Sequence, residues 1–124
     1  MNFNQYQERA HKTAIYPTDI SLEKYSPNGN YYPPTPNLKW IYPALGLSAE
    51  TGELMNKLKK VIRDKNGDID SEMMLDIKDE MGDILWYISE LCNSLNLDLE
   101  TIASMNLAKL AQRAMHNQIH GDKR

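Results

Sequence analysis

The chain has 124 residues, of which 25% are charged and 41% are hydrophobic, values that are ordinary for one soluble globular domain. Its net charge of −3 gives no electrostatic reason to expect a nucleic-acid partner. No apolar run approaches the roughly 20 residues of a membrane span, the N-terminus lacks a signal-peptide pattern, and the single Cys92 cannot form an internal disulfide. We therefore expect a cytoplasmic protein with one domain over residues 1–124 that binds neither nucleic acid nor a membrane.

The first predicted element is a helix over residues 4–15, with Asn4 as its N-cap and the Tyr16-Pro17 step after its end. Residues 17–40 then hold five of the six prolines and an Asn28-Gly29 turn signal. We expect an irregular loop in this stretch. A loop of such length in a small domain is either functional or a tolerated insertion, and the sequence leaves both interpretations open.

A second helix is predicted from Pro43 or Ala44 to Asp64, and the turn residues 65–68 end it. The apolar positions that share one of its faces are Leu47, Leu54, Leu58 and Val61. This spacing is typical of a helix that packs on a neighbour along its whole length.

A third helix is predicted from a cap at Asp70 or Ser71 to about Ser94. Its apolar positions alternate in steps of three and four, and they are Met74, Ile77, Met81, Ile84, Ile88, Leu91 and Leu95. A fourth helix begins after a cap at Asp98. The sequence thus predicts an all-α fold with four main helices. The apolar seam of the third helix is longer than the others can cover, so we expect a helical bundle completed by oligomerisation, as a homodimer or homotetramer.

Two acidic pairs border the apolar faces of the second and third helices. Glu50 and Glu53 form one pair, and Glu80 and Asp83 repeat the same three-residue step, which places both members of a pair on one helix face. A short turn joins the two helices, so they should be antiparallel neighbours and the pairs should converge. Four carboxylates in one groove repel one another unless cations lie between them.

Oxygen ligands of this kind suit Mg²⁺, with Mn²⁺ as a substitute, and the absence of His and Cys from both pairs argues against zinc. Because Mg²⁺ often shares its ligand shell with substrate phosphates, the pairs indicate a polyphosphate site. The alternative is a solvated acidic edge with Lys57, Lys60 and Lys78 as ion-pair partners. Chance alone gives roughly two such acidic pairs in this sequence, and a third pair, Asp76 and Asp79, is present.

The pattern Glu50-x-x-Glu53, 26 residues, Glu80-x-x-Asp83 resembles the MazG-type nucleoside triphosphate pyrophosphohydrolases. The surrounding stretches YPALGLSAETGELMNKLKKVIRD and DEMGDILWYISELCNSLNLDLETIASMNLAKL are similar to the motif helices of this family. The C-terminal stretch KLAQRAMHNQIHGDKR resembles a short branch found in bacteria and their phages. The similarity covers nearly the whole chain except residues 18–38.

The resemblance implies an enzyme that cleaves a nucleoside triphosphate between the α and β phosphates and releases a nucleoside monophosphate and pyrophosphate. It implies that Glu50, Glu53, Glu80 and Asp83 are both catalytic residues and Mg²⁺ ligands, with Glu50 or Glu53 also orienting the attacking water. Expected substrates are deoxynucleoside or non-standard nucleoside triphosphates.

Further substrate-binding residues are expected outside the acidic pairs. Asn106, Lys109 and Arg113 share a face of the fourth helix, where their polar groups could neutralise and bind phosphate. Lys57, one turn beyond Glu53, is a candidate for the same role. A nucleobase needs an apolar stacking surface, and the nearby aromatic candidates are Trp40, Tyr42, Trp86 and Tyr87. For each candidate the alternative is an ordinary core or solvated position.

Two other functions remain open at this point. The chain could be a non-catalytic helical dimerisation or adaptor module, or it could hydrolyse alarmones or nucleotide sugars. Pyrophosphate release from a triphosphate, with and without Mg²⁺, distinguishes these possibilities.

Overall fold

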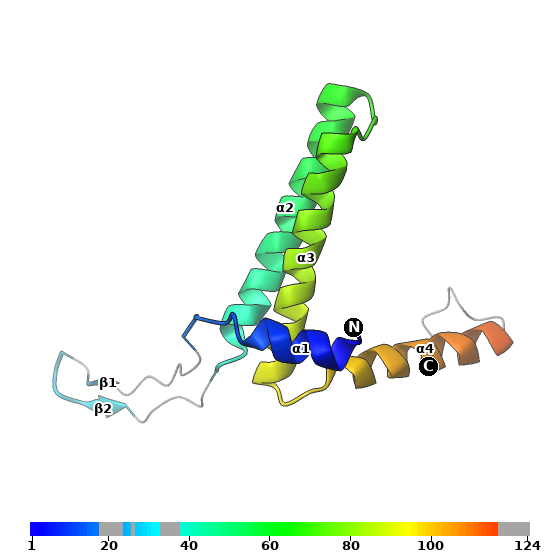
Figure 1. The fold of residues 1–124 in the computed structure, drawn as a ribbon. Coiled ribbons are helices and arrows are strands. Elements are labelled where there is room, and N and C mark those ends of the chain that lie inside the picture. Colours follow the sequence, from blue (N-terminus) through cyan, green and yellow to red (C-terminus); the bar gives the residue numbers. More distant parts are fainter. Residues whose placement is uncertain (18–23, 26, 33–37, 117–124) are drawn as a thin grey trace.

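The structure is a computed structural model that describes residues 1–17, 24–25, 27–32 and 38–116. Over these residues the chain forms four α-helices and one small hairpin, so the predicted all-α fold is confirmed (Figure 1). The hairpin departs from the irregular loop expected over 17–40, because β1 (Lys24–Tyr25) pairs antiparallel with β2 (Tyr31–Tyr32). The expected turn between them is confirmed, with Gly29 at a φ of 81°. The C-terminal stretch singled out above lies partly outside the described residues.

The body of the fold is a pair of long antiparallel helices, α2 (Ile41–Lys65) and α3 (Ser71–Ser94), which pack along their length (Figure 1). The α2 helix begins before Pro43, because a proline in the first turn lacks only an N–H that the helix leaves unpaired. The predicted turn is confirmed, with Asn66 and Gly67 at φ values of 54° and 82°. The predicted cap is also confirmed, because the Asp70 side chain accepts a hydrogen bond from Met73 N.

The first helix, α1 (Phe3–His11), differs from the prediction at both ends. Its N-cap is Asn2 rather than Asn4, because Asn2 and Gln5 exchange side-chain and backbone hydrogen bonds in a capping box. It ends four residues early, where both the backbone N–H and the hydroxyl of Thr13 bond to Ala10 O. The helix packs across α3, and its position is fixed by side-chain hydrogen bonds that reach the end of that helix.

Gln7 makes the most extensive of these contacts. Its amide nitrogen donates to Asn93 Oδ1 at 2.8 Å and to Leu97 O at 2.9 Å, and its oxygen accepts from Leu99 N at 2.8 Å. One side chain of α1 therefore links the end of α3 to the start of the last helix.

The last helix, α4 (Leu99–Met115), packs against α1 and runs away from the α2–α3 pair (Figure 1). Asp98 is its N-cap residue as predicted, but its carboxylate accepts from the Thr101 hydroxyl rather than from a backbone N–H. Much of the apolar surface of α4 is exposed, including Met105 and Leu107.

The buried core of this single chain is small. Its buried residues within the described part are Ala10, Pro43, Val61, Ser89, Glu90, Cys92 and Leu99. Along the α3 seam, Met74, Met81 and Leu95 are exposed, with Met81 at 56%. The helices of one chain therefore leave part of the α3 seam uncovered, as the sequence analysis expected. The oligomer that was predicted to cover it stays a prediction.

Candidate active site

Three of the four motif carboxylates meet between the two long helices. Carboxylate oxygens of Glu50 on α2 and of Glu80 and Asp83 on α3 all lie within 4.8 Å of one another. Glu50 and Glu80 are half-buried and Asp83 is exposed. The convergence follows from the antiparallel pairing, since the three-residue step puts Glu80 and Asp83 on the face of α3 that meets α2. We call these three residues the acidic cluster.

The members of the acidic cluster perturb one another strongly. A hydrogen bond shared with Glu80, followed by burial and the charges of Glu80, Asp83 and Glu53, raises the pKa of Glu50. The Lys57 ammonium, 2.9 Å from Glu80 Oε1, lowers the pKa of Glu80, whereas burial and then the charges of Asp79 and Glu80 raise the pKa of Asp83. The cluster thus holds more negative charge than its protein surroundings neutralise.

A divalent cation fits this arrangement. Oε2 of Glu80 is buried and receives no hydrogen bond from the described part of the chain, so it offers an unpaired acceptor. Opposite oxygen ligands of Mg²⁺ are about 4.1 Å apart, which the cluster reaches with small side-chain movements. All three donors are hard carboxylate oxygens, the type preferred by Mg²⁺ and Mn²⁺.

The structure separates the other acidic residues from this cluster. Glu53 is exposed, and its carboxylate lies outside the group of three, although its charge contributes to the raised pKa of Glu50. Asp76 and Asp79, which share the three-residue step, are exposed and also lie outside it. Spacing alone therefore did not distinguish the converging pairs from the third one.

An aromatic pocket of about 400 Å³ lies beside the exit of α1. The ring of Tyr16 stacks on Tyr42, with centroids 4.8 Å apart and planes inclined by 6°. Trp86 meets Tyr16 and Tyr87 edge to face, at 6.0 Å and 5.0 Å. The residues that line the pocket are Thr13, Ile15, Tyr16, Pro17, Tyr42, Trp86 and Tyr87. Its volume and its aromatic walls are typical of a small-molecule pocket.

The aromatic pocket and the acidic cluster both use α2 and α3, and on α3 they lie on adjacent turns. Tyr87 follows Asp83 by four residues on α3, and its ring packs directly against Gly46, four residues before Glu50 on α2. A side chain at position 46 would overlap that ring, so glycine is required for this approach. Burial, together with the nearby charges of Tyr42, Glu50 and Asp83, raises the pKa of Tyr87. On α3 one helical turn, about 5.4 Å along the axis, thus separates the two features, whereas on α2 the pocket residue Tyr42 precedes Glu50 by eight residues.

The remaining candidates are distributed unevenly. Lys57 contacts Glu80 of the acidic cluster, and Trp86 lines the aromatic pocket. Trp40 precedes α2 and is not among the pocket residues. Asn106, Lys109 and Arg113 lie on α4, which runs away from the α2–α3 pair, so one chain does not bring them to its own acidic cluster (Figure 1). Arg113 Nε is buried and has no hydrogen-bond partner within the described residues.

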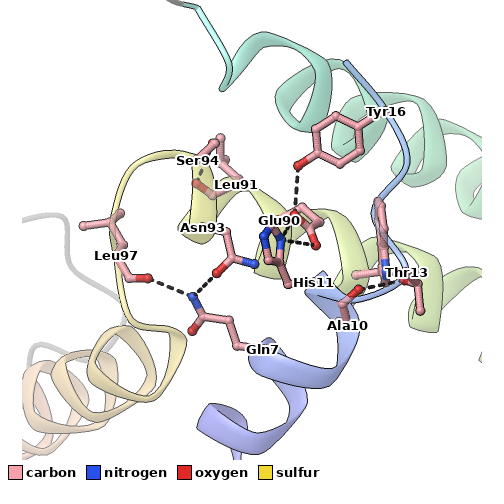
Figure 2. Close-up of polar contacts among 11 residues, drawn as sticks. Gln7, Ala10, His11, Thr13, Tyr16, Glu90, Leu91, Asn93, Ser94 and Leu97 are labelled. Atoms are coloured by element: carbon pink, nitrogen blue, oxygen red, sulfur yellow. Dashed lines mark hydrogen bonds and ion pairs between the residues drawn. The ribbon is translucent and has the colours of Figure 1, made fainter. Parts of the chain in front are cut away.

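The sequence analysis did not single out a second buried acid. Glu90 lies at the centre of a polar network, where its carboxylate accepts from Tyr16 and contacts His11 (Figure 2). A signal was available, because Glu90 is the only charged residue between Asp83 and Asp98 in the sequence.

Comparison with known proteins agrees with this geometry. Residues 43–118 match the sequence model of the MazG nucleotide pyrophosphohydrolase domain, a span that contains all four motif carboxylates. The chain belongs to the MazG nucleotide pyrophosphohydrolase family. It is also similar to the Gene 37 protein of Mycobacterium phage L5, with 37% identity over 124 residues that cover 98% of this chain and 96% of the phage protein. No solved structure matches.

The MazG match divides the site in an informative way. The acidic cluster, Trp86 and Tyr87 fall inside the matched residues 43–118, whereas Tyr16 and the rest of the α1 exit precede them. The aromatic pocket is therefore built partly from the family domain and partly from the segment before it.

Among the described helices, none has the length and apolar character needed to cross a membrane.

Proposed function

We propose that this protein hydrolyses nucleoside triphosphates, deoxynucleoside or non-standard ones, to a nucleoside monophosphate and pyrophosphate in a Mg²⁺-dependent reaction. The observation that supports this most directly is the acidic cluster with an aromatic pocket that begins one helical turn away along α3. A nucleotide has the same two parts, an anionic polyphosphate that needs cations and a flat base that needs a stacking surface.

Glu50, Glu80 and Asp83 would hold the metal, with Glu53 completing the set from the next turn of α2. When bound, Mg²⁺ supplies Lewis acidity, which makes water more acidic and offsets the charge that develops on the departing pyrophosphate. Lys57 holds Glu80 in its ionised, metal-binding form. Glu53 or Glu50 orients the attacking water; Glu53 is exposed and outside the cluster, which leaves its carboxylate accessible to water.

The base would enter the aromatic pocket lined by Tyr16, Tyr42, Trp86 and Tyr87. Stacking on tyrosine and tryptophan rings favours planar groups, and the hydroxyls on the pocket rim provide polar contacts. Trp40, at the start of α2, is a further candidate for contact with the sugar or base.

We further propose that the active form is a homo-oligomer in which α4 serves a neighbouring subunit. An apolar groove of about 470 Å³ on the α2–α3 pair is lined by Leu54, Met81, Gly82, Ile84, Leu85 and Ile88, and such a surface is suited to burial by a second copy. In that arrangement Asn106, Lys109 and Arg113 could reach the phosphates bound by a partner, which they do not reach within one chain.

The direct test is pyrophosphate release from a panel of ribo- and deoxynucleoside triphosphates, with and without Mg²⁺. Asp83→Asn is expected to abolish turnover, and Asp76→Asn, the same change on the same helix outside the acidic cluster, is the matched control. Activity that survives in Asp83→Asn would refute the metal role. Hydrolysis confined to alarmones or nucleotide sugars would reassign the substrate, and a folded protein that hydrolyses none of these would support the non-catalytic module.

Mixing an inactive variant with a weakened one tests the shared site. Asp83→Asn and Lys109→Ala subunits, co-refolded, should regain part of the wild-type rate if Lys109 acts across an interface, because some sites then combine two intact parts. No recovery would place Lys109 outside the neighbouring subunit's site.

A further inference from the structure

Glu90 is the most deeply buried ionisable side chain of the described structure. Its exposed fraction is 0%, although it belongs to an amphipathic helix with solvent on one side. Burying a carboxylate is costly even when it is paired, and an apolar side chain of similar size at such a position is often as stable or more so. The stability of α3 therefore does not explain why position 90 holds an acid. The contacts of the Glu90 carboxylate explain it better.

Both oxygens of Glu90 are directed at the segment that leaves α1 (Figure 2). The Tyr16 hydroxyl donates to Oε2 at 2.8 Å. His11 Nδ1 lies 3.1 Å from Oε2 and 3.3 Å from Oε1 and donates to the carboxylate. Among the described residues, Tyr16 and His11 are the polar side-chain partners of Glu90. The His11 side chain is 56% exposed.

The segment that Glu90 contacts carries one wall of the aromatic pocket. Its first residues are held by backbone hydrogen bonds from Thr13 to Ala10 and from Ala14 to His11, and the Thr13 hydroxyl accepts from Trp86 Nε1 at 2.8 Å. At its far end Tyr16 is held by its hydroxyl on Glu90 and by its ring on Tyr42 and Trp86. Glu90 thus fixes the end of the segment that is most distant from the helix.

We propose that Glu90 is a positioning residue for nucleobase recognition, holding the Tyr16 ring in the plane that the aromatic pocket requires. It touches neither the acidic cluster nor the pocket interior and acts through the Tyr16 hydroxyl. His11, bound to the same carboxylate, keeps Glu90 oriented toward the segment. The inference rests on the proposed nucleotide hydrolysis, and it adds a determinant of substrate affinity that joins Glu90, inside the residues that the family match covers, to Tyr16, which precedes them.

Three variants separate positioning from packing. Tyr16→Phe keeps the ring and removes only the hydroxyl. Glu90→Gln keeps an amide oxygen for Tyr16 and an N–H for His11, whereas Glu90→Leu removes every polar contact. Glu72→Gln, the same chemical change at an exposed position in the first turn of the same helix, is the control.

Loss of one buried hydrogen bond corresponds to about a three- to tenfold change in affinity. We expect Tyr16→Phe and Glu90→Leu each to raise KM by about this factor with kcat within about twofold of wild type. Glu90→Gln should restore most of the affinity. The double variant Tyr16→Phe/Glu90→Leu should be no worse than either single one, because both delete the same bond. Tyr16→Phe remains informative if Glu90→Leu does not fold.

A second readout needs neither metal nor phosphate. The chain has two tryptophans, so Trp40→Phe leaves Trp86 as the only tryptophan reporter, and a nucleoside that enters the aromatic pocket should quench its fluorescence. Weaker quenching in Tyr16→Phe would support the inference even if no triphosphate were hydrolysed. An unchanged KM and unchanged quenching in Tyr16→Phe would overturn it while leaving hydrolysis intact. Absence of quenching by every nucleoside in the Trp40→Phe protein with Tyr16 intact would also overturn it.

Discussion

Gly46 allows a sharp test of how closely α2 and α3 approach at the site. In a helix interior, replacing glycine by alanine normally stabilises the fold by about 0.5–1 kcal/mol, because the backbone of glycine loses more entropy on folding. At Gly46 the added methyl group would overlap the Tyr87 ring. Overpacking of this kind costs about 1–3 kcal/mol, which exceeds the gain in helix propensity. Gly46→Ala should therefore be destabilising by about 1–2 kcal/mol.

Gly52 on the same helix provides the matched control, because a methyl group there would meet no atom within 4 Å. With an unfolding entropy typical of 124 residues, 1 kcal/mol corresponds to about 4 °C in Tm. Thermal unfolding followed by circular dichroism should show Gly46→Ala about 4–8 °C below wild type and Gly52→Ala about 2–4 °C above it. In a Tyr87→Ala background, Gly46→Ala should become stabilising like Gly52→Ala. A Tm for Gly46→Ala at or above wild type would refute the close approach of Tyr87 to α2.

Three further outcomes are expected. Asp83→Asn should lose Mg²⁺-dependent turnover yet melt at a higher temperature than wild type without metal, because one repelling charge is removed; equal or lower melting would contradict this. The pKa of Glu50 is raised in the folded state, so this group stabilises the fold at pH values below its ordinary pKa, and metal-free wild type should lose that stability as the pH rises through the raised pKa. Adding Mg²⁺ at 100 times its Kd should stabilise the fold by about 2.7 kcal/mol. Melting curves from pH 4 to 8, with and without Mg²⁺, test both outcomes. Ile88→Asp should unfold or aggregate, because it places a charge in the groove proposed for a second copy, and a well-folded monomer in sedimentation would argue against that interface.

Local chemistry explains what could be predicted from the sequence. The α3 helix was predicted with both ends correct, since Asp70 is a strong N-cap and the apolar steps of three and four continue to Ser94. The convergence of Glu50 with Glu80 and Asp83 followed from one short turn between two long helices, which leaves antiparallel packing as the simple solution.

Contacts between distant parts of the chain explain what was missed. The end of α1 was placed too late because the Tyr16-Pro17 step was taken as the stop, whereas contacts of His11 and Tyr16 with Glu90, 79 and 74 residues away, hold the segment outside the helix. The direction of α4 depends on the connection before it, where Asn96 adopts a φ of 56°. The helix face shared by Asn106 and Lys109 was visible in the sequence, but the direction in which it projects was not.

The division of the site between two parts of the chain bears on how its selectivity could change over evolution. The acidic cluster is built on the two longest helices, where a substitution disturbs both packing and the proposed metal site. One wall of the aromatic pocket belongs instead to a short segment after α1, fastened by a few side-chain bonds such as the one from Tyr16 to Glu90. Exchanges in that segment alter the shape offered to a base without touching the groups proposed to act on the phosphates. Under the proposed function, the long helices form a fixed reaction centre and residues 12–17 form an exchangeable recognition segment. Libraries confined to residues 12–17 would then change substrate preference while leaving the reaction centre intact.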